Sequence, residues 1–126
     1  MNTETTQKPT LDKVAKLIEI KPEILSLGKV WYAEELLILI QEMNALLVKP
    51  GEQTWRLPTR EELHQSFQKN DKKFGEWYTW TRDDDSFNSF NGVPILWIVN
   101  MSNNEESSDS DGSQVEAYLI QDKQKV

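Results

Sequence analysis

The chain has 126 residues, a formal net charge of −7 at pH 7 and no cysteine. This length suits one domain, and the lack of cysteine excludes a disulfide framework, a thiol nucleophile and a thiolate metal site. No apolar run approaches the roughly 18 residues of a membrane span, and no secretory leader pattern opens the chain. We therefore expect a cytoplasmic protein without membrane contact.

The first thirty residues predict an unordered start and two short elements. Residues 1–9 are polar, and we expect them to be disordered, with a single domain from 10 to 126. Residues 11–20 place apolar side chains at helical spacing, although Ile18 and Ile20 also alternate as in a strand. A short helix or turn followed by extended chain is expected here, with residues 24–27 extended.

Residues 32–47 predict the main helix. Glu34 and Glu35 suit its first turn, where the helix dipole favours negative charge. Apolar residues continue at three- and four-residue steps along one face. They are Leu36, Leu39, Ile40, Met43, Leu46 and Leu47. The helix is expected to end before the turn signal Pro50-Gly51.

The stretch 55–81 carries the strongest local signals. Thr59 and Glu62 have the spacing of a capping box, in which each side chain accepts a backbone N–H at a helix start. Pro58 cannot extend a preceding helix and biases Leu57 towards an extended conformation. We expect an extended Trp55-Arg56-Leu57-Pro58 segment, a helix from 60 to 68, and a strand from 77 to 81.

These residues also resemble a known family. The run Trp55-Arg56-Leu57-Pro58-Thr59, followed by Glu62 and by Tyr78-x-Trp80-Thr81, is similar to bacterial and phage domains with a C-type-lectin-like fold, such as the C-terminal domain of collagen-like adhesins. The similarity covers residues 31–81. The family's closing Val-Arg strand corresponds only to a possible strand at residues 117–120, without the Arg. The resemblance implies a fold and leaves the function open, because one scaffold hosts unrelated binding tasks.

The rest of the chain predicts strands joined by acidic loops. Residues 82–92 are expected to form a polar loop and residues 93–101 a strand. A second strand at 114–121 is expected to return through an acidic, Ser-rich loop as a long hairpin. Together these elements predict an α+β, C-type-lectin-like fold, with two helices packed on a small antiparallel sheet with long loops.

Residues 83–112 contain seven carboxylates and no Lys or Arg, so they account for the net charge. This distribution argues against nucleic-acid binding, which needs a basic surface. Uncompensated carboxylates steer a basic partner, and aromatic side chains beside them provide anchors. The expected partner-binding residues are Asp83, Asp84, Asp85, Phe87, Phe90, Glu105, Glu106, Asp109 and Asp111. The alternative is a solvated, disordered segment that aids solubility.

We therefore predict a non-enzymatic protein-binding module without a cofactor. One plausible form is a phage or mobile-element inhibitor that imitates the charge of DNA and engages a basic, nucleic-acid-binding protein. The alternative is a lectin-like domain for a carbohydrate or Ca²⁺, because Asp and Asn oxygens suit hard cations. The acidic segments lack EF-hand spacing, and the lectin motifs Glu-Pro-Asn and Trp-Asn-Asp are absent. The oligomeric state stays open.

The remaining polar and aromatic residues have simpler interpretations. His64 is the only His, and it is expected on the surface of a polar helix, with Glu61 as its candidate partner. A catalytic role would require a group that orients it. Arg56 is expected to form hydrogen bonds with the backbone or with an acidic residue near the turn from segment 55–58 into the helix at residue 60. Trp55, Trp77, Trp80 and Trp97 are expected to fill the core, with stacking on sugars or bases as the alternative.

Overall fold

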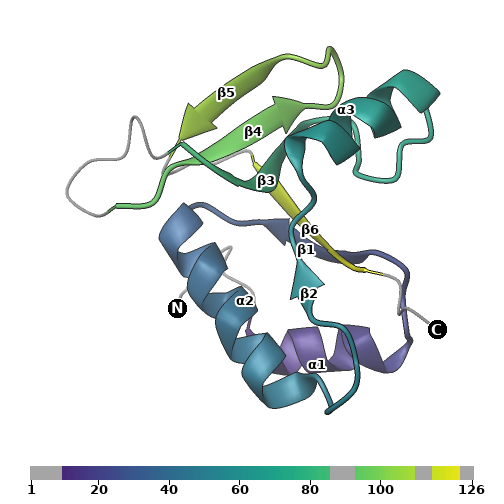
Figure 1. Ribbon diagram of the computed structural model, residues 1–126, viewed down its shortest axis with the longest axis vertical. Coiled ribbons are helices and arrows are strands. Elements are labelled where there is room, and N and C mark those ends of the chain that lie inside the picture. The colour runs from purple at the N-terminus through teal and green to yellow at the C-terminus, as the bar shows by residue number, and fades with distance from the viewer. Residues whose placement is uncertain (1–9, 86–92, 110–114, 123–126) are drawn as a thin grey trace, which may run out of the picture.

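The computed structural model describes residues 10–85, 93–109 and 115–122. These residues form three helices and a six-stranded mixed sheet (Figure 1). The α+β class agrees with the prediction, whereas the expected pair of helices and purely antiparallel sheet do not. The expected disordered segment 1–9 lies outside the described residues.

Helices α1 and α3 each begin at a side-chain N-cap. Helix α1 is Leu11–Glu19, and the Thr10 side chain accepts a hydrogen bond from the Lys13 N–H, which favours helix over strand at this position. Helix α2 is Ala33–Leu47. Helix α3 is Arg60–Lys69, and the capping box of Thr59 and Glu62 is present as predicted.

The predicted apolar face of α2 is wrong at one residue. Ala33, Leu36, Leu39 and Met43 are buried, but Leu46 is 69% exposed. Leu46 lies on the flank of the stripe in the last turn of the helix, where a 3.6-residue period carries it away from the buried face. The core therefore covers less of α2 than the sequence suggested.

The strands order differently from the prediction. They are β1 (Leu25–Lys29), β2 (Trp55–Arg56), β3 (Tyr78–Asp84), β4 (Leu96–Asn100), β5 (Glu106–Asp109) and β6 (Glu116–Gln121). The sheet order is β1-β6-β3-β4-β5, with β2 also paired to β6. Strand β6 is antiparallel to β1 and β2 and parallel to β3. The sheet is therefore mixed, and the long hairpin from 93–101 to 114–121 does not form.

A short hairpin takes the place of that long one. Strand β4 pairs with β5, so residues 106–109, expected to be loop, form an edge strand. The Asn100 carbonyl accepts hydrogen bonds from the Asn103 and Asn104 amides in the turn, and Asn104 adopts a φ of 69°. Asn tolerates this left-handed conformation better than most residues. The Asn-rich turn thus reverses the chain directly after β4, before the residues that were expected to form the returning strand.

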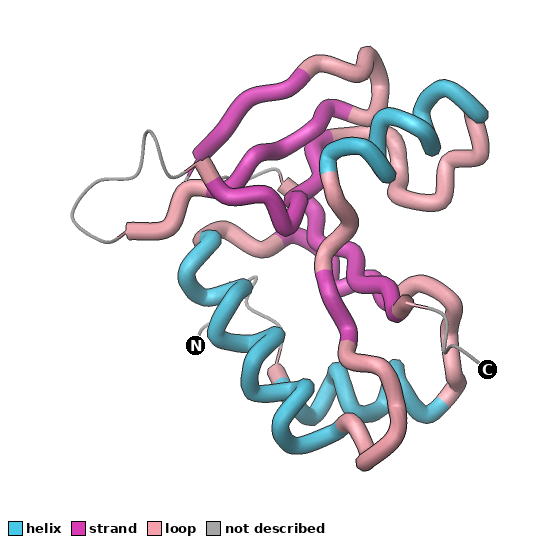
Figure 2. The backbone as a smooth tube through the Cα atoms, in the orientation of Figure 1, coloured by secondary structure: helices cyan, strands magenta, loops and turns pink. Residues whose placement is uncertain are grey.

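The core has two parts, one on each face of β4. Leu96 and Ile98 belong to the larger cluster with residues of α1, α2 and β6, while Val99 and Met101 join Leu63 of α3 and Phe74. Figure 2 shows α1 and α2 at one end of the molecule and α3 at the other, with strands between them. Burial on both faces fixes β4, and β4 in turn fixes β5.

The tryptophans do not all fill this core. Trp80 is fully buried and its indole N–H donates to the Val30 carbonyl at 2.8 Å, and Trp55 is also buried. The prediction is wrong for Trp77, which is 45% exposed and packs edge-on against Tyr78. Trp77 precedes β3, so the strand's alternation does not turn its side chain inwards.

Gly75 provides a test of the packing between the α3–β3 connection and β6. It has a φ of +75°, and a Cβ placed there would lie 2.6 Å from the Tyr118 hydroxyl oxygen. Gly51 has a φ of +89° and no atom within 4 Å of such a Cβ. Gly51→Ala should cost about 1–2 kcal/mol of unfolding free energy for the backbone alone. Gly75→Ala should cost about 1–3 kcal/mol more, because Tyr118 must move.

Urea unfolding of both variants measures this difference. Equal losses would show that the space around Gly75 accepts a methyl group.

Candidate functional site

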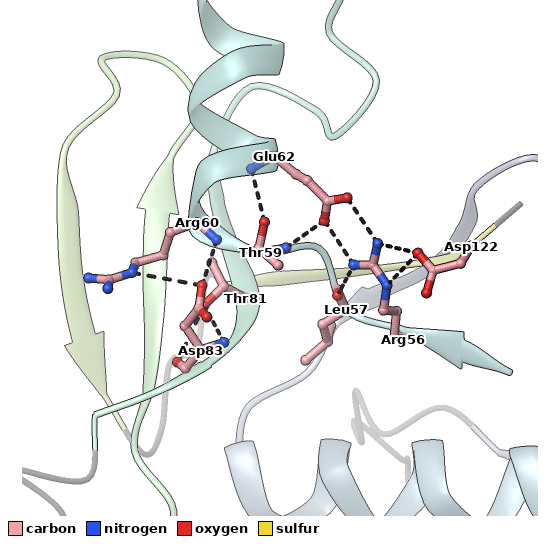
Figure 3. A network of polar contacts seen from close by, with 8 residues as sticks. All are labelled: Arg56, Leu57, Thr59, Arg60, Glu62, Thr81, Asp83 and Asp122. Atoms are coloured by element: carbon pink, nitrogen blue, oxygen red, sulfur yellow. Dashed lines mark hydrogen bonds and ion pairs between the residues drawn. The ribbon is translucent and has the colours of Figure 1, made fainter.

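A polar network joins three elements at the start of α3 (Figure 3). The Arg56 guanidinium donates to both carboxylate oxygens of Glu62, at 2.8 and 2.9 Å, and to Asp122 at 2.7 Å. It also donates to the Leu57 carbonyl at 3.1 Å. The prediction that Arg56 bonds to backbone and to an acid is confirmed. The bidentate contact lowers the pKa of Glu62 and raises that of Arg56.

Glu62 has a second task in the same network. Its Oε1 accepts the Thr59 N–H at 2.8 Å, and the Thr59 hydroxyl oxygen accepts the Glu62 N–H at 3.1 Å. Leu57 and Pro58 are buried beside it, and the Pro58 carbonyl accepts the Arg82 N–H from β3. The Trp55 backbone bonds to the Asn44 side chain through both its N–H and its carbonyl, which ties β2 to α2. The segment 55–59 and the start of α3, which we term the corner, therefore form part of the scaffold.

The acidic residues that follow Arg82 are not a free loop. Asp83 and Asp84 belong to β3, which corrects the prediction of a loop from 82 to 92. Asp83 accepts the Arg60 N–H at 2.7 Å, and its carboxylate lies 3.8 Å from the Arg60 Nε (Figure 3). A carboxylate at the N-terminus of a helix is favoured by the unpaired N–H groups and the dipole there. Asp83 therefore positions α3.

Asp85 is also used inside the molecule. Its side chain is buried and accepts a hydrogen bond from the Ser108 hydroxyl at 2.8 Å. Its backbone N–H donates to the Ile95 carbonyl. Asp85 thus connects the end of β3 to β5 and is a structural residue rather than part of an exposed contact surface.

Glu106 lies in a cluster with two residues of α3. Its carboxylate lies 2.5 Å from His64 Nε2 and 3.6 Å from Arg60 Nη1. The other ring nitrogen of His64 contacts the Asn104 side-chain oxygen. The Arg60 guanidinium also lies over the Trp97 ring, 4.7 Å from its centroid, a cation–π contact. The contacts of His64 are with residues of the β4–β5 hairpin and not with Glu61, the candidate that the sequence offered.

Both ring nitrogens of His64 approach an oxygen, so the doubly protonated ring is the form that donates to both. Burial lowers the pKa of His64, but the hydrogen bonds to Glu106 and Asn104 outweigh burial and raise it above its usual value. Neither nitrogen is left to accept a proton from a substrate. This arrangement suits a structural clasp better than a general base.

The sequence did not reveal this cluster. His64 and Glu106 are 42 positions apart, and no local spacing links them. The register of β4 with β5 explains the contact, because it places Glu106 opposite Val99, on the face that α3 covers.

The predicted acidic residues therefore divide into two groups. Asp83, Asp85 and Glu106 bind groups of the same chain. Asp84, Glu105 and Asp109 are exposed, and the Glu105 carboxylate also accepts a hydrogen bond from the Asn103 side-chain amide at 3.2 Å. Phe87, Phe90 and Asp111 lie outside the described residues.

Two hollows lie on the described surface near α3, and neither is lined by His64. The larger, about 400 Å³, lies beside α3 and β6, with Ile24, Phe74 and Ile120 among the residues that line it. The second, about 340 Å³, lies between the C-terminal half of α3 and Met101. Within the described ranges no group of three or more His, Cys, Asp or Glu side chains is arranged to bind a metal ion. No helix in those ranges is long and apolar enough to cross a bilayer.

Comparisons of the chain with family models, with curated proteins and with solved structures found no match.

Replacing Glu62 by Ala tests the corner. The variant loses the Thr59 N–H acceptor and both Arg56 bonds, so we expect it to lose about 1–2 kcal/mol of unfolding free energy. Glu61→Ala, an exposed change in the same helical turn, is the matched control and should cost under about 0.5 kcal/mol. Because the pKa of Glu62 is lowered in the fold, the difference between wild type and Glu62→Ala should shrink as pH falls below 4.5.

Urea unfolding at several pH values measures these effects. Equal losses of unfolding free energy in the two variants would mean that the contacts of Glu62 with Thr59 and Arg56 add no stability beyond that of an exposed helical residue.

His64→Gln tests the clasp between α3 and the β4–β5 hairpin. The folded pKa of His64 is raised, so its stabilising contribution should be complete below 6.5 and decline as pH rises through the folded value. Wild type should therefore lose stability across that interval while His64→Gln does not. Unfolding by urea above about pH 5 keeps the carboxylates ionised. NMR titration of the imidazole gives the folded pKa, and a value at or below 6.5 would contradict the clasp.

Proposed function

We propose that the protein is a non-enzymatic binding module that engages a basic protein through Asp84, Glu105 and Asp109, which we term the acidic rim. Within the described part of the predicted acidic segment, these three carboxylates are the exposed ones that are left after Asp83, Asp85 and Glu106 are assigned to the scaffold. They differ from the scaffold acids in lying on the face of the sheet away from α3.

The register of three strands is the observation that carries this proposal. Leu96 of β4 is paired with Asp84 of β3 on one side and with Asp109 of β5 on the other. Directly opposed residues project to the same face, and strands lie about 5 Å apart, so Asp84 and Asp109 are about 10 Å apart on one face. Glu105 shares that face with Asp109, because residues four apart in extended chain point the same way.

The three carboxylates of the acidic rim together favour a cationic partner. Their charge speeds the encounter with a basic surface and disfavours anionic ones. Proteins that bind nucleic acids display such basic surfaces, because their Lys and Arg neutralise phosphates. An inhibitor from a phage or mobile element that imitates the charge of DNA would use the acidic rim in this way.

The scaffold we propose is C-type-lectin-like. Support comes from the capping box, the buried Leu57 and Trp80, and the order of α2 and α3 before the antiparallel β3–β4–β5 unit. A carbohydrate-binding role has one supporting observation, the partly exposed Trp77, since aromatic side chains are able to stack on sugar rings. The acidic rim has no role in carbohydrate binding, so variants of the rim distinguish the protein-binding proposal from the carbohydrate alternative.

The test uses two triple variants of equal net charge. Asp84→Asn, Glu105→Gln and Asp109→Asn together neutralise the acidic rim, whereas Glu19→Gln, Glu34→Gln and Glu42→Gln neutralise exposed acids on α1 and α2. Two probes are used. One is poly-L-lysine, and the other is a basic nucleic-acid-binding protein purified from a bacterial extract by elution from a heparin column. Neutralising the rim should raise Kd by about tenfold or more and flatten its dependence on salt. The control should stay within about twofold.

Equal behaviour of the two triples would contradict the proposal, because net charge and not the rim would then govern binding. Binding to a glycan panel that Trp77→Ala abolishes and the rim variant leaves unchanged would support the carbohydrate alternative instead.

A further inference from the structure

Strand β5 is an edge of the sheet. Its four residues pair with β4 on one side, and no other described strand pairs with it (Figure 1). An edge strand presents backbone N–H and C=O groups that an added strand is able to bind. Which of these groups face outwards follows from the hydrogen-bond pattern of the hairpin.

The Asn100 N–H donates to the Glu105 carbonyl at 2.8 Å, so these two residues form a hydrogen-bonded pair. Hydrogen-bonded and non-hydrogen-bonded pairs alternate along antiparallel strands. The register then makes Ser107 and Asp109 the residues that bond to β4, through Ile98 and Leu96. The backbone groups of Glu106 and Ser108 point to the open edge.

The pairing of β4 with β3 on its other side agrees with this alternation. The Met101 N–H donates to the Trp77 carbonyl, so odd-numbered residues of β4 bond to β3 and even-numbered ones bond to β5. The hydrogen bonds of β4 to β5 and those of β4 to β3 therefore lead to the same result: the backbone N–H and C=O groups of Glu106 and Ser108 point away from β4.

The same two residues are anchored through their side chains. The Glu106 carboxylate contacts His64 and Arg60, and the Ser108 hydroxyl donates to Asp85. Their outward backbone groups are therefore held in a fixed extended geometry before any partner arrives. Glu105, Ser107 and Asp109 project to the opposite face and are exposed.

We infer that β5 is a docking edge for an extended basic segment of the partner, which adds to the sheet as a strand bonded to the backbones of Glu106 and Ser108. The inference rests on the proposed function and specifies how the acidic rim is used. Main-chain bonds provide affinity in this mode, and alternate side chains provide specificity.

The charges on the two faces specify the segment. Basic residues at every second position would face Glu105 and Asp109. Uncharged residues would occupy the positions between them, because the Arg60 guanidinium lies on the α3 face. A second copy of this chain does not fit this edge, since two β5 strands would bring like charges together, a device that prevents edge pairing.

Amide hydrogen exchange followed by NMR tests the inference directly. In the free protein the Glu106 and Ser108 amides should exchange fast, and those of Ser107 and Asp109 slowly. A short peptide of alternating Lys and Val should slow exchange at Glu106 and Ser108 by about tenfold or more. A peptide of the same composition with Lys and Val in separate blocks, and one of alternating Glu and Val, should not.

A pair of variants at Ser108 provides the second test. Ser108→Pro removes an outward N–H and places the ring at the open edge without removing a bond to β4, a position that tolerates Pro. Ser108→Ala loses the same contact with Asp85 and keeps the N–H. We expect Ser108→Pro to bind the alternating peptide about tenfold more weakly than Ser108→Ala. If Ser108→Pro fails to fold, the exchange experiment alone decides.

The outcomes separate this inference from the proposal beneath it. If the rim variant weakens binding but Glu106 and Ser108 gain no protection, the strand addition is wrong and the binding function stands. If the alternating Lys and Val peptide does not bind the wild type, and the rim triple and its control behave alike with both probes, both are wrong.

Discussion

The bidentate contact between Arg56 and Glu62 is the constraint on which the positions of the other elements depend. One carboxylate closes the capping box of α3 and binds the guanidinium that also reaches Asp122 beyond β6. The start of α3 is thereby fixed relative to β2 and β6. Since α3 carries Arg60 and His64, the same contact, together with Asp83 at the start of α3, helps to align the helix with the β4–β5 hairpin.

The fold assigns different tasks to neighbouring carboxylates. Asp83, Asp85 and Glu106 accept hydrogen bonds or contact cationic groups of the same chain, while the exposed Asp84 and Asp109 project to the other face of the sheet. This separation follows from the period of two along each strand, which sends adjacent side chains to opposite faces. Neighbouring acids in the sequence therefore occupy two structurally distinct environments once they lie in a strand.

The sequence identifies features whose cause is local. Thr59 and Glu62 are three residues apart, so their reciprocal bonds need nothing beyond one helical turn. The β5 strand is different, because Glu, Ser and Asp have low strand propensity and become strand here through pairing with β4, which is buried on both faces. The contacts of His64 with Glu106 and of Arg60 with Asp83 join residues 42 and 23 positions apart, and such pairings depend on register.

The internal contacts of β5 would affect the affinity of the proposed strand addition. Ordering a flexible segment costs free energy on association, and a pre-ordered surface avoids that cost on one side of the interface. Glu106 and Ser108 are fixed by His64, Arg60 and Asp85, so only the partner's segment would have to be ordered. If a partner strand adds to β5 as proposed, the carboxylates within the scaffold would contribute to recognition without touching it, because they hold the backbone groups of Glu106 and Ser108 in place.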